Sequence, residues 1–224
     1  MTRSLRVRVL FVAVLLSSCT PSQEKPAEPA QEKPAIPAQE KPVEPTAEQL
    51  KKAKDEFAKI GATYDAVTDP LTKRISHWFS LSSETKDADL KNLPNPPFSF
   101  TLHINGTQVT DVGLKELKDL MNLTSLVLDG AQVTDVGLKE LKELTNLTEL
   151  GFFGTQVTDA GLKELKDLKN LTSLDLSSTQ VTDVGVKELK DLKNLTKLNL
   201  YNTQLTDASV KELQEALPKC QILR

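Results

Sequence analysis

The sequence is poor in the residues that small disulfide-bonded folds and membrane spans require. Its 224 residues include two cysteines, Cys19 and Cys220, too few for a disulfide-stapled miniature fold. The apolar run from Val9 to Leu16 has eight residues, whereas a membrane-spanning helix needs about 20. Aromatic residues make up only 4%. The 28 basic and 31 acidic side chains nearly balance, so the net charge of -3 gives no reason to expect nucleic acid as a partner.

Motifs for catalysis and metal binding are also lacking. The sequence contains no HExxH, CxxC, GxSxG or phosphate-loop pattern. A hydrolase would have to rest on His103 with Asp129 or Asp175, and we keep it only as a remote alternative. Cys220, in the sequence LPKCQIL, is expected to be a small core or capping residue rather than a nucleophile. We therefore expect no enzymatic activity, no cofactor and no metal.

Residues 1–20 have the features of an export signal. A basic start precedes the apolar run, and Leu16-Ser17-Ser18-Cys19 follows it. This tetrapeptide resembles the bacterial lipobox, in which a branched residue and two small ones precede the cysteine that becomes acylated. The resemblance implies a signal peptide at 1–18 and a lipid on Cys19, which would anchor an exported protein to the bacterial cell membrane or outer membrane. The alternative is an ordinary signal peptide with an incidental cysteine.

A proline-rich segment follows Cys19. It repeats an octet as QEKPAEPA at 23–30, QEKPAIPA at 31–38 and QEKPVEP at 39–45. Proline at this frequency removes amide donors and favours polyproline II, so the segment cannot nucleate a core. We predict that residues 19–46 comprise the attachment cysteine and a tether, reaching at most roughly 80 Å at about 3.1 Å per residue. A spacer is favoured over a ligand for a proline-binding domain.

Beyond residue 98 a single unit recurs in register at a constant spacing. Its shared text is TQVTDxGLKELKxLxNLTxLxLxx, and its copies begin at Thr107, Ala131, Thr155, Thr179 and Thr203. The unit resembles a leucine-rich repeat, and more narrowly the class found in cysteine-containing repeats, with threonine where that class often has cysteine. The resemblance covers residues 99–224 and implies a repeat domain.

Physical reasoning on the residues predicts the same architecture. Leucines two positions apart, such as Leu174 and Leu176, form one face of a short strand. Each repeat also contains a Thr-Asp helix start, such as Thr110-Asp111, followed by leucines at helical spacing. One strand and one helix cannot bury both apolar faces within a single repeat, so neighbouring repeats must stack. We predict a short right-handed α/β leucine-rich-repeat solenoid, with strands on the inside and helices on the outside.

A solenoid must cover the open end of its first repeat, and residues 47–98 are predicted to form this N-terminal helical cap. A capping-box pattern at 46–49 and an apolar face ending at Gly61 predict a helix from about 47 to 60. Asp69-Pro70 predicts a second helix start, followed by Leu71, Ile75, Trp78 and Phe79 at helical spacing. His77 is expected to be a half-buried cap residue rather than a catalyst.

The positions on the helix side are nearly identical from repeat to repeat. The opposite charges of the Lys and Glu columns, for example Lys163 and Glu164, compensate each other and indicate a solvated convex face. The aspartate column that includes Asp111 is predicted to cap the helix starts rather than to form a calcium ladder. Threonines such as Thr155 are expected to bond backbone inside the turns. The glutamine column that includes Gln108 is either structural or an exposed amide strip.

The strand positions between the buried leucines vary instead, which favours a binding surface on the concave face. Phe153 and Tyr201 are predicted to point outward as anchors. The other candidate ligand-binding residues are His103, Val127, Glu149, Asp175, Lys197 and Asn199. We expect a protein or peptide partner, with a saccharide possible, and contact with the membrane only through the lipid. The alternative is an envelope-structural lipoprotein without a specific ligand, whose tether sets a distance.

Overall fold

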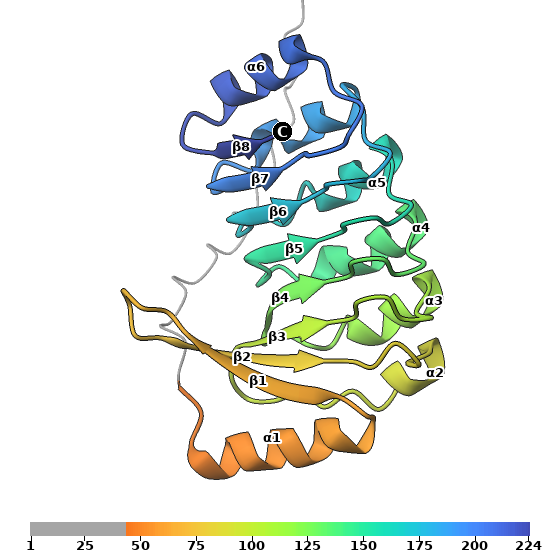
Figure 1. Cartoon of the computed structure of the whole chain (residues 1–224), viewed down its shortest axis with the longest axis vertical. Helices are drawn as coiled ribbons and strands as arrows, with labels where there is room; N and C mark the ends of the chain where they lie inside the picture. The colour runs from red at the N-terminus through yellow and green to blue at the C-terminus, as the bar shows by residue number, and fades with distance from the viewer. Residues whose placement is uncertain (1–43) are drawn as a thin grey trace, which may run out of the picture. The chain divides into compact units, whose positions relative to one another are not determined.

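The computed structural model describes residues 44–224, which contain one eight-stranded sheet (Figure 1). The signal peptide, Cys19 and nearly all of the tether lie outside these residues. The strands follow one another across the sheet in chain order, and they are β1 (Thr63–Thr68), β2 (Ile75–Ser80), β3 (Phe100–His103), β4 (Leu123–Val127), β5 (Glu149–Gly151), β6 (Ser173–Asp175), β7 (Lys197–Asn199) and β8 (Gln221–Leu223).

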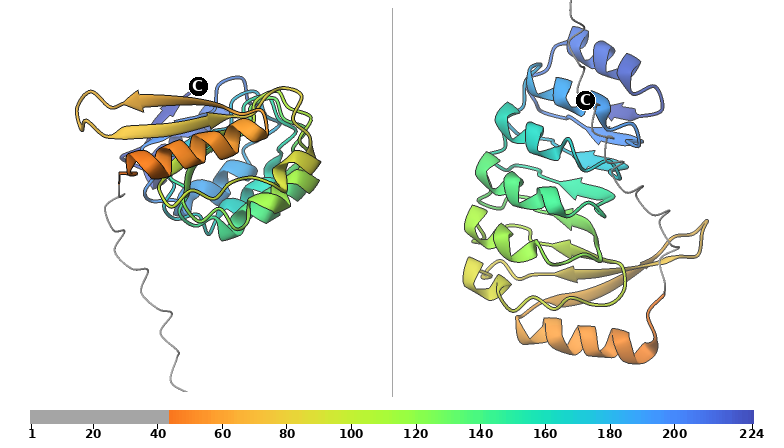
Figure 2. Two further views of the ribbon diagram at one scale, coloured as in Figure 1. Left: turned by 90° about the horizontal axis from the view of Figure 1, so that it is seen from below. Right: turned by 180° about the vertical axis from the view of Figure 1, so that it is seen from behind.

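Strand pairing repeats with the period of the sequence. β1 and β2 are antiparallel, and every later neighbour pair from β2 to β8 is parallel. Leu126, Leu150, Leu174 and Leu198 face one another across β4 to β7. These leucines are at most 3% exposed, so the strand face predicted to be apolar is the core face. The helical segments pack along this one side of the sheet, and the opposite side has no covering layer among the described residues (Figures 1 and 2).

The helical part of each repeat is shorter than a regular helix. One α-helical turn continues as 3-10 helix, as in α3 (Asp111–Leu114) with η1 (Lys115–Leu117). The later pairs are α4 (Asp135–Leu138) with η2 (Lys139–Glu143) and α5 (Asp159–Leu162) with η3 (Lys163–Leu165), and η4 (Gly185–Asp191) stands alone. Only the last repeat has a longer helix, α6 (Asp207–Ala216). The strand-plus-helix repeat is therefore confirmed, although the unit is so short that it leaves room for little more than two helical turns.

The aspartate column links each repeat to the next. The Thr158 N–H donates to Oδ1 of Asp135 at 2.8 Å, and the Thr158 hydroxyl donates to Oδ2 at 2.6 Å. The same pair of bonds recurs from Asp87–Thr110 to Asp183–Thr206, always 23 residues apart. The helix N-caps are the threonines, so the aspartates do not cap their own helices but bridge repeats. A Cβ on Gly161 would lie too close to Oδ1 of Asp135, which explains the glycine in this part of the repeat.

The first predicted helix is confirmed. α1 (Ala47–Lys59) begins with a capping box in which Thr46 and Gln49 exchange hydrogen bonds. The ring of Phe57 stacks on Phe79 with centroids 3.9 Å apart, and it also contacts the ring of Phe100. α1 thereby covers the open end of the core, as a solenoid cap must.

The second predicted helix is wrong, so the cap is not wholly helical. Asp69-Pro70 forms the turn of the β1–β2 hairpin, and β2 occupies the residues expected to be helical. Tertiary pairing decides the outcome: Phe79 enters the core, while Trp78 faces the other side of the sheet beside Thr101. The repeat geometry also begins earlier than residue 99, because α2 (Asp87–Leu90) provides Asp87, the first member of the aspartate ladder.

Two residues that the sequence predicts to pack rather than to react, His77 and Cys220, are buried. His77 is 4% exposed, and its Nδ1 lies 2.9 Å from the Tyr64 hydroxyl. Burial lowers the pKa of His77 and so favours the neutral form of its ring. Cys220 is buried and unpaired, and burial raises its pKa, as expected for a packing residue rather than a nucleophile. No helix within residues 44–224 has the length and hydropathy to cross a membrane.

Candidate functional site

The side of the sheet away from the helices presents two rows of side chains. The first row comprises Trp78, Thr101, Ser125, Glu149, Ser173, Lys197 and Gln221. The second comprises Ser80, His103, Val127, Gly151, Asp175, Asn199 and Leu223. All the predicted concave-face residues within the strands lie in these rows, so the structure brings them onto one surface. Of them, Glu149 and Lys197 are the exposed ones, and the others are half-buried.

Phe153 and Tyr201 lie beside this surface but not within the strands. Each stands in the turn that follows its strand, β5 or β7, where the chain leaves the sheet. Phe153 is 48% exposed and Tyr201 65%, so the prediction that both point outward is confirmed. Two strand spacings separate them, which is about 10 Å. The aromatic pair therefore forms a rim along one edge of the concave face rather than its floor.

Two carboxylates, Asp129 and Asp175, belong to the repeats on either side of Gly151, which has no side chain. Gly151 follows Val127 and precedes Asp175 in the second row. A Cβ on Gly151 would lie 3.3 Å from Oδ1 of Asp129, a residue in the turn after β4. That oxygen also accepts a hydrogen bond from the Phe153 N–H at 3.1 Å. Burial raises the pKa of Asp129, and the negative charge of Asp175 raises it further.

The N-terminal end of the concave face carries an aromatic contact that the sequence did not reveal. The rings of Trp78 and His103 lie 4.8 Å apart on β2 and β3. Burial lowers the pKa of His103, against an opposing influence of Glu149. Trp78 was missed because its neighbours have helical spacing, although Ile75, His77 and Phe79 also alternate as in a strand. Within residues 44–224, His103 forms no hydrogen bond to Asp129 or Asp175, the arrangement that a hydrolase would need.

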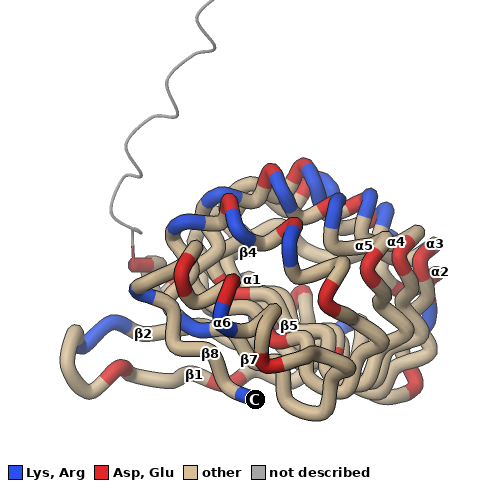
Figure 3. The backbone as a smooth tube through the Cα atoms, turned by 90° about the horizontal axis from the view of Figure 1, so that it is seen from above, with Lys and Arg blue, Asp and Glu red and all other residues tan. Residues whose placement is uncertain are grey.

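The remaining surfaces show less variety. The glutamine side chains of the column from Gln108 to Gln204 are exposed, and in the described chain their amides form no hydrogen bond, so the column is an exposed amide strip. Lys and Arg alternate with Asp and Glu over the helical side (Figure 3).

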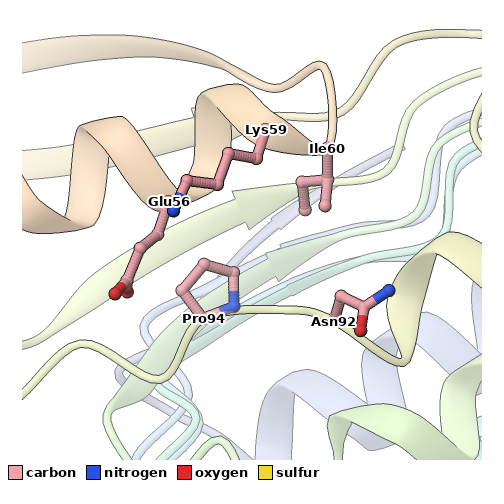
Figure 4. Close-up of a pocket in the computed structure, with 5 residues that line it drawn as sticks. All are labelled: Glu56, Lys59, Ile60, Asn92 and Pro94. Atoms are coloured by element: carbon pink, nitrogen blue, oxygen red, sulfur yellow. The ribbon is translucent and has the colours of Figure 1, made fainter.

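A depression of about 400 Å³ between α1 and the loop after α2 is lined by Glu56, Lys59, Ile60, Asn92 and Pro94 (Figure 4). Residues 44–224 contain no cluster of three His, Cys, Asp or Glu suited to a metal ion.

Comparison with family models identifies the repeats. The model of two-copy leucine-rich repeats matches residues 145–190 and 169–215, and the model of a single leucine-rich repeat matches residues 119–142. The chain therefore contains leucine-rich repeats, and its fold is an α/β leucine-rich-repeat solenoid. Leucine-rich-repeat proteins are typically non-enzymatic scaffolds that bind other proteins, which agrees with the expectation of a protein without enzymatic activity.

Three solved bacterial structures are similar to the chain. An internalin from Listeria monocytogenes has 28% identity and a TM-score of 0.49, with 61% of this chain and 36% of that chain covered. Internalin C2 from the same species has 31% identity, a TM-score of 0.44 and coverages of 60% and 54%. A leucine-rich-repeat protein from Leptospira interrogans has 29% identity, a TM-score of 0.46 and coverages of 60% and 32%. The chain thus spans between a third and about half of these proteins. No curated protein matches the sequence.

Proposed function

We propose that this protein is an exported binding module that holds a protein or peptide on its concave strand face. The observation that carries the proposal is the pair of exposed aromatic side chains, Phe153 and Tyr201, at the rim of a sheet face that no other described element covers. Large aromatic side chains are the residues that most often provide binding energy in protein interfaces. The rows of polar side chains beside them supply hydrogen-bonding groups of several kinds, which suits selective recognition.

The binding experiment uses the full chain, immobilised and exposed to an extract of the cell envelope. Each captured protein is identified by mass spectrometry and then titrated against the wild type, Phe153→Ala and Tyr201→Ala. Val136→Ala is a matched control, because Val136 is 59% exposed at a helix start away from the aromatic rim. We expect each aromatic substitution to weaken binding by about fivefold or more, and the control to have no effect.

Other results of this titration would change the proposal. Loss of affinity in Val136→Ala alone would move the site to the helical side. Unchanged affinity in all three variants would favour the envelope-structural lipoprotein, in which the solenoid only packs and the tether sets a distance.

We also propose that the tether connects this module to a lipid on Cys19. Support comes from the order of basic start, apolar run, two serines and cysteine near the N-terminus. Growth with a radiolabelled fatty acid should label the wild type and leave Cys19→Ala unlabelled. Cys220→Ala is the matched control, since it removes the other cysteine and should remain labelled. Equal labelling of Cys19→Ala and wild type would refute the anchor.

A further inference from the structure

The ring of His77 is buried, yet one of its two nitrogens lacks a hydrogen bond. Nδ1 lies 2.9 Å from the Tyr64 hydroxyl, whereas Nε2 has no hydrogen-bond partner among residues 44–224. Buried polar atoms are nearly always hydrogen-bonded, so an unpaired one indicates a contact that is still to be made. The carboxylate of Glu44, in the last residues of the tether, has its Oε2 3.8 Å from Nε2, just beyond hydrogen-bond distance.

The carboxylate of Glu44 determines which nitrogen carries the proton of the neutral ring. If the proton were on Nδ1, the lone pair of Nε2 would lie next to the negative charge of Glu44, which is unfavourable. With the proton on Nε2, the Tyr64 hydroxyl donates to Nδ1. When Nδ1 takes up a second proton from solvent, the ring becomes a cation, and the Tyr64 hydroxyl rotates to accept a hydrogen bond from Nδ1.

The charged groups around His77 act in opposite directions. Burial lowers the pKa of His77, the negative charge of Glu44 raises it, and the positive charge of Lys54 on α1 lowers it. Nζ of Lys54 lies 3.8 Å from the centre of the Tyr64 ring on β1. The uncharged ring of Phe98 also contacts His77, with centroids 5.3 Å apart. Of these groups, Glu44 alone favours the cationic ring, so protonation of His77 strengthens the contact between the two residues.

This contact lies on the core side of the sheet. Along β2, His77 and Phe79 are buried on the core side, whereas Trp78 between them belongs to the concave face. A chain held at Glu44 therefore enters α1 from the side of the sheet opposite to the concave face. The side chain of Glu44 is 57% exposed and that of His77 only 5%, so the ring is fixed by packing and the carboxylate is the partner that can move.

We propose that Glu44 and His77 form a pH-dependent latch between the tether and the cap, closed when the His77 ring is protonated and open when it is neutral. With the latch closed, the residues before α1 are held against β2, and the tether starts from the side of the sheet that faces away from the concave surface. With the latch open, the chain is held from Thr46 onward by the capping box of α1. The inference goes beyond the proposed function, because it concerns how the domain is held on its tether and needs no ligand.

NMR spectroscopy of the full chain tests both parts of the latch. The ring signals of His77 are followed between about pH 8 and pH 5, and the heteronuclear NOE of the Glu44 amide reports the motion of the chain at this residue. We expect this NOE to rise as His77 becomes protonated. In Glu44→Gln, the midpoint of the His77 titration should fall by at least about 0.5 pH unit, and the NOE at position 44 should no longer depend on pH. Glu48→Gln is the matched control, because it removes an exposed glutamate from the first turn of α1 and should change neither result.

Three results would overturn the latch. An unchanged titration midpoint in Glu44→Gln would show that the two residues do not interact. A Glu44 NOE that stays constant while His77 titrates would show that their interaction does not hold the chain. A His77 ring that remains neutral down to about pH 5 would leave the latch open throughout. Circular dichroism over the same pH range excludes unfolding as the cause, and none of these results depends on the aromatic rim, so the proposed binding function is tested separately.

Discussion

Removal of one carboxylate from the aspartate ladder should destabilise the solenoid measurably. In Asp135→Ala, the backbone N–H and the hydroxyl of Thr158 both lose their acceptor, at contacts of 2.8 and 2.6 Å. Hydrogen bonds to a charged acceptor contribute about 1.5–3 kcal/mol each, but these two share one partly buried site. We therefore expect a loss of about 2–3 kcal/mol in the free energy of unfolding. Asp135→Asn keeps one acceptor oxygen and should lose about half as much.

The assay is urea denaturation of the full chain followed by circular dichroism, with thermal melts as a second measure. A loss of this size corresponds to a fall of about 5–10 °C in the melting midpoint. Asp167→Ala serves as the control, since Asp167 is exposed and its side chain forms no hydrogen bond within the described residues. Its unfolding free energy should change by at most about 0.5 kcal/mol.

Two results would refute the reasoning. If Asp135→Ala and Asp167→Ala were equally stable, the ladder would contribute nothing to the cohesion of the repeats. If calcium raised the stability of the wild type above its value in EDTA, and Asp135→Ala abolished the increase, the column would be a calcium ladder after all.

Three further predictions concern single side chains. Leu174→Asp should cost about 4 kcal/mol or more because it places a charge in the strand core, whereas Lys187→Ala on the exposed helical side should cost at most about 0.5 kcal/mol in the same melts. Asp129→Asn should be more stable than wild type at pH 7, because the raised pKa of Asp129 means that its ionised form destabilises the folded state. That advantage should disappear as the pH falls below the pKa of an unfolded aspartate, about 3.9. Gly154→Ala should cost about 1 kcal/mol through its φ of +67° alone, since no atom lies within 4 Å of the added methyl; no loss would show that this turn relaxes freely.

The repeats could be predicted from the sequence because the residues that define each unit lie close together in the chain and recur in every copy. Leu126, Leu150, Leu174 and Leu198 occupy the same position in successive units, so one alignment within the chain predicted strand, core face and stacking together. The outward direction of Phe153 and Tyr201 followed from the same period of two. The capping box of α1 was predicted because it involves residues only three apart.

Tertiary structure decided the features that depend on contacts between distant residues. Residues 71–79 satisfy a helical and a strand period at once, and the pairing of β2 with β3 selects the strand, which places Trp78 beside His103. The aspartate ladder joins residues 23 apart, where no local rule connects a carboxylate to its donors. The close approach of Asp129 to Gly151 likewise depends on stacking, because side-chain proximity across strands is a property of the sheet rather than of any one repeat.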